Sequence, residues 1–214
     1  FDSDRLSYHM LSTQGPKISI ADLNGDSKND IVFPGAKGYP TQILFANENK
    51  WIRNERNKEV LEENKEIEHI ESAILDVDND GDLDIYMTSG GVENSIYSTF
   101  LYDILLLNDG SGMFTKSKQN LPDDELKISS ESVTYADIDS DGDLDLFVGE
   151  RSKIGKYGLP GSGYILVNDG NGNFENQTKK IAPKLLNIGM ITDAAFYDFD
   201  NDRDQDLIVV GEFM

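Results

Sequence analysis

The sequence predicts an all-β fold made of repeated four-stranded antiparallel units, and three observations support this prediction. Short segments rich in β-branched and aromatic residues recur along the 214 residues. Tight turns of the Asn-Asp-Gly type, which favour hairpins, separate some of these segments. An acidic motif returns four times at near-regular intervals, which indicates that the strands belong to one repeat.

The acidic motif sets the period of the repeat. Its copies are ADLNGDSKNDIVF (21–33), LDVDNDGDLDIYM (75–87), ADIDSDGDLDLFV (136–148) and YDFDNDRDQDLIV (197–209). Their first aspartates are 54, 61 and 61 residues apart. A second motif follows in phase, as LLNDGSGMF (106–114), LVNDGNGNF (166–174) and a shortened LFANENKW (44–51). Two motifs in phase over this length indicate a genuine repeat rather than chance.

Each period has room for four short strands. One strand precedes the acidic run, a second follows it (IVF, IYM, LFVG, LIVVG), and a third reads QILFAN, DILLLN or YILVN. A fourth begins at Trp51, Phe114 or Phe174, whose rings we expect in the core. Four strands in a period somewhat above 50 residues are typical of a β-propeller blade. We predict one partial β-propeller domain over 1–214, with about three and a half blades in units near 17–58, 70–118, 131–178 and 191–214.

The acidic runs predict metal sites. Counted from the first aspartate, positions 1, 3, 5 and 9 carry side-chain oxygens in every run, and we add the backbone carbonyl of position 7. Neighbouring carboxylates about 4 Å apart repel by roughly 1 kcal/mol in water, so a cation would stabilise the turn. Such oxygen ligands suit Ca²⁺ better than Mg²⁺, and we expect up to four Ca²⁺ ions. The candidate ligands are Asp22, Asn24, Asp26, Lys28, Asp30; Asp76, Asp78, Asp80, Asp82, Asp84; Asp137, Asp139, Asp141, Asp143, Asp145; Asp198, Asp200, Asp202, Asp204 and Asp206.

The acidic runs have two alternative interpretations. An EF-hand needs Glu at position 12 and flanking helices, whereas position 12 is apolar here and the flanks read as strands. Acidic turns that hold no metal are the simpler alternative. Position 6 requires a left-handed residue, which Gly81 and Gly142 supply in the second and third loops. Ser27 and Arg203 replace glycine in the first and fourth loops, so we expect those two to bind metal more weakly.

Composition excludes several classes of protein. Asp and Glu number 40 against 19 Lys and Arg, and a net charge of -21 repels nucleic acid and anionic lipid surfaces. Cysteine is absent, which excludes disulfides and thiolate metal sites. We expect no membrane insertion, because no apolar run approaches the roughly 18 residues that span a bilayer. Since the chain starts at Phe1 without a signal peptide, we expect a mature or excised piece of a longer precursor.

The motifs resemble the FG-GAP/VCBS calcium-binding repeats of integrin α-type propellers. STQGPKISIADLNGD, the SGG at 89–91, FVGERS and GMITDAAFYDFD…DLIVVGEFM look more specifically like the cartilage-acidic-protein (ASPIC/UnbV) group. The resemblance implies that each calcium loop joins the first two strands of a blade. Complete members of the group would carry about seven blades. The resemblance therefore implies that the rest of its own propeller, or another subunit, completes this arc.

The long loops opposite the metal loops are the expected place for a ligand. The candidates for contact are Tyr97, Tyr102, Arg151, Lys156 and Tyr157, although ordinary surface residues are the simpler interpretation of each. The mixed charges of residues 53–71 fit either a short helix or a solvated connection. Neither His9 nor His69 lies in a sequence context that suggests catalysis.

The functional prediction is a calcium-stabilised binding or scaffolding propeller that recognises a protein or a glycan and is not an enzyme. The alternative is a carbohydrate-active lyase or dehydratase built on a calcium-loop propeller. Calcium sites of extracellular modules have dissociation constants of roughly 10⁻⁴ to 10⁻³ M, which exceed cytosolic calcium levels. We therefore expect an extracellular, cell-surface or periplasmic protein.

Overall fold

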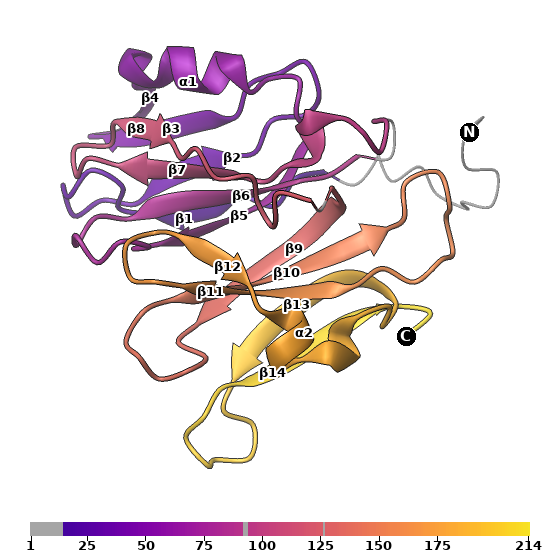
Figure 1. The fold of residues 1–214 in the computed structure, drawn as a ribbon. Coiled ribbons are helices and arrows are strands. Elements are labelled where there is room, and N and C mark those ends of the chain that lie inside the picture. Colours follow the sequence, from indigo (N-terminus) through magenta and orange to yellow (C-terminus); the bar gives the residue numbers. More distant parts are fainter. Residues whose placement is uncertain (1–14, 92–93, 126) are drawn as a thin grey trace.

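The computed structural model of the protein describes residues 15–91, 94–125 and 127–214. Within these ranges the chain forms three four-stranded antiparallel sheets and one two-stranded sheet, stacked in chain order (Figure 1). The strands are β1 (Ser19–Ala21), β2 (Asp30–Phe33), β3 (Gln42–Asn47), β4 (Lys50–Arg53), β5 (His69–Leu75), β6 (Asp84–Ser89), β7 (Ile104–Asn108), β8 (Phe114–Lys116), β9 (Ser129–Ala136), β10 (Asp145–Ser152), β11 (Gly163–Asn168), β12 (Phe174–Asn176), β13 (Met190–Tyr197) and β14 (Asp206–Glu212). The all-β, four-stranded prediction is confirmed.

Each sheet is a simple meander. Consecutive strands pair in the orders β1-β2-β3-β4, β5-β6-β7-β8, β9-β10-β11-β12 and β13-β14. The turn between the third and fourth strands closes the pairs Asn108–Phe114 and Asn168–Phe174. Glycines with positive φ inside these turns, such as Gly110 and Gly170, explain why the Asn-Asp-Gly sequence forms tight hairpins here. This meander is the blade of a β-propeller, and the blades do not close into a ring within the described residues.

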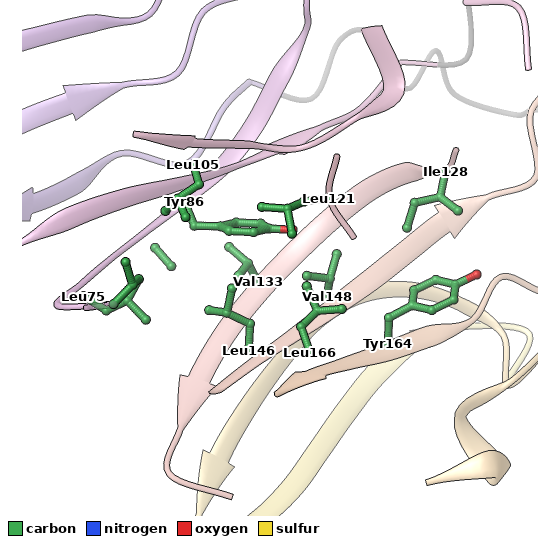
Figure 2. Packing of buried hydrophobic residues seen from close by; sticks show 12 residues of the cluster. Leu75, Tyr86, Leu105, Leu121, Ile128, Val133, Leu146, Val148, Tyr164 and Leu166 are labelled. Atoms are coloured by element: carbon green, nitrogen blue, oxygen red, sulfur yellow. The ribbon is translucent and has the colours of Figure 1, made fainter. Parts of the chain in front are cut away.

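Neighbouring blades pack face to face through alternate residues of the second strand. Val32, Tyr86 and Phe147 occupy the same repeat position and are all 0% exposed. Each belongs to a different apolar cluster, and each cluster joins one blade to the next. Figure 2 shows the middle cluster, in which Tyr86 of the second blade meets side chains of the third, including Leu146 and Val148. Because strand side chains alternate between faces, one strand serves two blade interfaces.

The first strands of the blades lie side by side. β5 packs against both β1 and β9, and β9 packs against β13. The ammonium group of Lys17 lies 3.1 Å from carboxylate oxygens of Glu71 in β5 and of Asp193 in β13. This single side chain therefore connects the first, second and fourth blades, as expected if the first strands surround a common axis.

Helical segments are short and lie between strands. Within the described residues they are η2 (Glu55–Asn57), α1 (Lys58–Glu63), η3 (Thr99–Leu101), α2 (Thr178–Ile181) and η4 (Pro183–Leu185). The helix considered for residues 53–71 is thus present as η2 and α1, and Val60 and Leu61 of α1 pack against the cluster between the first two blades. The connection is therefore more than a solvated linker. Among the described residues, no helix is long and apolar enough to cross a membrane.

Trp51 departs from expectation. It pairs with Ala46 just as Phe114 pairs with Asn108, so its place in the repeat is as predicted. However, Trp51 is 50% exposed whereas Phe114 is 3% exposed. Phe114 packs against the preceding blade, and no described residues form a blade before the first. The expectation that Trp51 lies in the core is therefore wrong, because its blade face is uncovered.

Candidate metal centres

The four acidic loops join the first two strands of each blade and project from one side of the stack, at the left and lower left of Figure 1. Their backbones share one conformation, with positive φ at positions 4 and 6 of every loop. Position 6 is Ser27 (φ 64°), Gly81 (92°), Gly142 (99°) and Arg203 (82°). The predicted left-handed residue at position 6 is confirmed, and the second one at position 4 was not foreseen. Four different sequences thus build the same loop.

In three loops the aspartates at positions 1, 3 and 9 converge. Each loop brings one carboxylate oxygen from each of these aspartates within 4.8 Å of the other two. The clusters are Asp76, Asp78, Asp84; Asp137, Asp139, Asp145; and Asp198, Asp200, Asp206. In the first loop, Asn24 at position 3 replaces a carboxylate by an amide oxygen. Three carboxylates this close fit a divalent cation with hard oxygen ligands.

Several of these oxygens lack a donor among the described residues. Asp76 Oδ1, Asp78 Oδ1 and Asp137 Oδ1 are buried and accept no hydrogen bond. Burial, followed by the charge of Asp80, raises the pKa of Asp78, and burial raises the pKa of Asp84 to about 6. A buried anion without a partner is costly, and a bound cation would offset that cost. The residues present therefore fit the calcium ion that the loop sequence predicts.

The position-9 aspartates also hold the blade together. The Oδ2 atom of Asp84 accepts a hydrogen bond from the backbone N–H of Val77 at 3.0 Å, and its Oδ1 atom accepts one from the N–H of Asn108 in the third strand at 2.8 Å. Asp30 and Asp145 make the equivalent pairs of bonds and are 0% exposed. The acidic spacing had indicated only a ligand role for these residues. In every repeat the position-9 aspartate stands at the start of the second strand. This constant position was the sequence signal that could have indicated the second role.

The position-5 residues shape the loop from within. Asp80 Oδ1 accepts the backbone N–H of Asp82 at 2.9 Å, and Asp141 Oδ1 accepts that of Asp143 at 3.0 Å. The corresponding bonds join Asp26 to Lys28 and Asp202 to Asp204. These carboxylates stand outside the clusters of three. Metal ligation by position 5, and by the carbonyl of position 7, stays a prediction.

The first and fourth loops differ from the other two in charge. The Lys28 ammonium group lies 3.1 Å from Asp26 Oδ2, where it competes with any cation in the first loop. Arg203 takes the left-handed conformation in the fourth loop, at a cost of roughly 1–2 kcal/mol for a residue with a side chain. Both features agree with the predicted ranking of the loops, although no measured affinity tests it.

Residues 76–148 and 155–209, together more than half of the chain, match the FG-GAP-like repeat family. The chain belongs to this family. No curated protein matches it. The chain is similar to the solved structure of an Agrocybe aegerita lectin described as recognising non-reducing terminal N-acetylglucosamine, with 22% identity and a TM-score of 0.44. The match covers 74% of this chain and 36% of the lectin, so the chain spans little more than a third of its length.

The FG-GAP blades place the five predicted ligand-contact residues in two groups. Lys127 donates to the Tyr97 carbonyl oxygen and lies 5.3 Å from the centre of the Tyr102 ring, so these two tyrosines are neighbours. Arg151 and Tyr157 both bond to the carboxylate of Glu212, and Lys156 is exposed beside Tyr157.

Arg151 requires a correction. It was expected on an exposed loop, but it lies in β10 and is 2% exposed. Its guanidinium group donates to Glu212 at 2.9 Å and to the Met190 carbonyl oxygen at 3.4 Å. These bonds tie the third blade to the fourth, because Glu212 and Met190 both belong to the last sheet. Arg151 was assigned to a loop because the length of the second strand was underestimated.

A second group of ionisable side chains, which sequence reasoning missed, lies where the first strands meet. It comprises Lys17, Glu71, Glu131 and Asp193. Burial raises the pKa of Glu131 to about 7, opposed by the charges of Arg151 and Lys17. These residues come from all four FG-GAP blades, so only the assembled arc brings them together. His69 lies nearby in β5, where burial lowers its pKa to about 4, and His9 lies outside the described residues.

Proposed function

We propose that this chain is a calcium-stabilised binding or scaffolding propeller that acts outside the cytosol. The observation that carries the proposal is the convergence of three carboxylates within 4.8 Å in equivalent loops of three blades. Buried carboxylate oxygens without a donor in two of these loops support it further. In each loop, the side chains of positions 1, 3, 5 and 9 and the carbonyl of position 7 would hold the ion. The ion would supply positive charge that neutralises the loop.

The binding part of the proposal depends on the scaffold. The acidic loops occupy one side of the blades, and the long connections between second and third strands lie on the other side, where binding residues usually reside on rigid scaffolds. Tyr97 and Lys156 are exposed and Tyr102 and Tyr157 are half-buried on these connections, so they are offered for contact with a protein or glycan. We assign the chain no catalytic role. The sequence segments around residues 12–26 and 189–214 resemble the ASPIC/UnbV group, and this resemblance supports a place in that group.

The proposed location follows from the calcium concentration that sites of this kind need. Extracellular calcium modules bind with dissociation constants of roughly 10⁻⁴ to 10⁻³ M, a range filled outside the cytosol. An exported, surface-bound or periplasmic protein would meet that concentration. The net charge of -21 would also favour cations over anionic partners.

Calorimetric titration of calcium into the chelator-treated protein tests the metal part. We expect saturable binding at two or more sites, with magnesium weaker, and weaker calcium binding at one site in Asp139→Asn, which replaces a carboxylate by an amide oxygen. Glu59→Gln, on the exposed surface of α1, is the matched control because it removes one carboxylate outside the loops. The proposal would be contradicted if the heat of calcium binding were the same in Asp139→Asn and in the wild type, or if calcium and magnesium bound equally well.

Two further measurements test the binding part. With the exported full-length protein, we expect capture of a protein or a glycan that requires calcium. Capture should be weaker in the Tyr97→Ala variant. Release of an unsaturated sugar from a polyuronide, seen as new ultraviolet absorbance, would contradict a role without catalysis.

A further inference from the structure

The first acidic loop differs from the other three at two adjacent positions. Position 3 is the amide Asn24 and position 4 is Gly25, so the pair reads Asn-Gly. The other loops have an aspartate at position 3, and their position 4 always carries a side chain, in Asn79, Ser140 and Asn201. An asparagine followed by glycine is prone to deamidation, because glycine has no side chain to keep its backbone nitrogen away from the asparagine carbonyl carbon.

The loop holds the Asn24 side chain in an orientation that favours attack on this carbon. Its Oδ1 atom accepts a hydrogen bond from the backbone N–H of Asp26 at 3.0 Å. In the fourth loop, Asp202 N–H donates to Asp200 Oδ1 at 3.2 Å, so the bond belongs to the shared loop conformation. Such a turn folds the side chain back along the following peptide, which brings Cγ of Asn24 next to the nitrogen of Gly25. The same donor stabilises the negative charge that develops on Oδ1 during attack.

The two nitrogen atoms that react have no other partner in the part of the chain that the structure describes. Neither the Gly25 N–H nor the Nδ2 group of Asn24 donates a hydrogen bond there. Gly25 is exposed, and a Cβ atom built on it would meet nothing within 4 Å. Water and hydroxide can therefore reach the backbone nitrogen, remove its proton and later hydrolyse the product.

The hairpin of the third blade contains the same dipeptide in a different setting. Asn171 is exposed and is followed by Gly172. Its Nδ2 group donates to the Asp169 carbonyl oxygen at 3.0 Å, and its Oδ1 atom accepts no hydrogen bond from the described residues. The leaving nitrogen is thus held, and the reacting carbonyl lacks a donor. The dipeptide sequence does not distinguish Asn24 from Asn171, whereas the structure favours reaction at Asn24.

We propose that Asn24 is a site of spontaneous deamidation in the folded protein and that it reacts faster than Asn171. The backbone nitrogen of Gly25 bonds to Cγ of Asn24, and the bond from Cγ to Nδ2 breaks. The NH₂ group and the proton of the Gly25 N–H leave together as ammonia. Water then opens the cyclic imide at either of its two carbonyl carbons, which gives aspartate or isoaspartate.

Deamidation changes the charge and the shape of the first loop. Both products add one negative charge. The aspartyl product places a carboxylate at position 3, as in the clusters of the other three loops. The isoaspartyl product inserts one carbon atom into the backbone, which displaces the residues that follow position 3. The reaction itself needs no metal ion, so it is independent of the proposed function.

Peptide mapping by mass spectrometry of the intact chain, incubated in its folded state at mildly alkaline pH, tests the proposal. We expect amide loss at Asn24 to be about tenfold faster than at Asn171, as one hydrogen bond to the reacting oxygen allows. The matched control is the same chain unfolded in guanidinium chloride, in which the two rates should become similar. The fold thereby accounts for the difference.

A variant separates the Asn-Gly pair from its surroundings. Ser140 adopts the left-handed conformation at position 4 of the third loop, with φ of 63°, so Gly25→Ser keeps a residue that this loop type accepts. We expect the variant to slow amide loss at Asn24 and to leave the rate at Asn171 unchanged. Three results would overturn the proposal. They are an equal or faster rate at Asn171 in the folded chain, a ratio of rates that unfolding does not change, and amide loss at Asn24 that is as fast in Gly25→Ser as in the wild type.

Discussion

At the scale of the residue, the four acidic loops share one backbone conformation but differ in the energetic cost of adopting it. Positions 4 and 6 adopt left-handed φ in all four loops, whether or not glycine is present. Around Gly81 and Gly142, an added Cβ would meet nothing within 4 Å, so space does not require glycine there. Ser27 and Arg203 therefore differ from these glycines in the free-energy cost of a left-handed backbone, which is higher for residues with a Cβ atom.

Replacing Arg203 by Gly should stabilise the fourth loop. We expect Arg203→Gly to raise the free energy of unfolding by about 1 kcal/mol in urea, because φ of 82° then carries no steric penalty. Calcium affinity of that loop should rise as well. Arg203→Ala separates the two causes, since it removes the charge but keeps Cβ. Equal stability of the Gly and Ala variants would show that charge, not backbone conformation, limits this loop.

Asp103 predicts a pH dependence that is separate from the metal loops. Its carboxylate accepts hydrogen bonds from Ser89 N–H (2.7 Å), Tyr86 O–H (2.8 Å) and Ser130 O–H (3.0 Å). Burial nevertheless raises its pKa to about 7. A carboxyl group whose pKa is higher in the folded state stabilises the fold at low pH. That contribution is lost as the pH rises from about 4 to 7, by at most about 1.4 kcal/mol per pH unit.

Comparison with Asp103→Asn isolates this contribution. The stability difference between wild type and variant, measured by urea unfolding in chelator from pH 4 to 7.5, should shrink as the pH rises. Groups such as Glu131 and His69 titrate in both proteins and cancel in the difference. A difference that is constant with pH would contradict the raised pKa of Asp103.

At the scale of the element, the third-to-fourth-strand hairpins of the second and third blades each bond to the acidic loop of the preceding blade. Asn168 donates its amide to the carbonyl oxygen of Val77, which lies between Asp76 and Asp78 in the second loop. The hairpin of the third blade therefore holds the candidate metal loop of the second. Leaving a buried carbonyl without a donor costs about 1–3 kcal/mol.

The Asn168→Ala variant should lose both stability and calcium affinity. We expect a destabilisation of about 1–3 kcal/mol and weaker calcium binding in the second loop, measured by urea unfolding and calorimetry. Asn173→Ala is the control, because that amide bonds only to Asp169 within the exposed turn. Similar losses in both variants would show that the turn, rather than the bond between blades, is responsible.

Strands and loops were predictable because their signals are local. Alternation and turn residues predict each strand and hairpin. The acidic spacing predicts that the aspartates at positions 1, 3 and 9 meet, whereas the position-5 aspartates, expected with them, lie outside the clusters. The amide of Asn168 and the exposure of Trp51 depend instead on which blade faces touch, and strand periodicity does not contain that information. Arg151 was misplaced for a related reason, since its strand continues through polar residues that are buried only by the next blade.

At the scale of the whole molecule, the acidic loops and the blade interfaces form one connected system. Asn79 of the second loop donates to Asp143 Oδ1 of the third at 2.6 Å, and the Asn108 amide connects the second blade to the first loop. Much of the net charge of -21 lies in these loops. Calcium bound there would act on several blade contacts at once, so its effect should appear in the unfolding of the whole arc.

Removal of calcium should therefore lower the melting temperature of the whole chain in one transition. At a free calcium concentration ten times the dissociation constant, each site adds about 1.4 kcal/mol, so three sites add about 4 kcal/mol. For a chain of this size that corresponds to a shift of about 10 °C between chelator and calcium, measured by calorimetry or circular dichroism. Sodium chloride at matched ionic strength is the control, because it screens repulsion between carboxylates without occupying a site. If sodium raised the melting temperature as far as calcium does, charge screening alone would explain the stability, and the carboxylate clusters would not be metal centres.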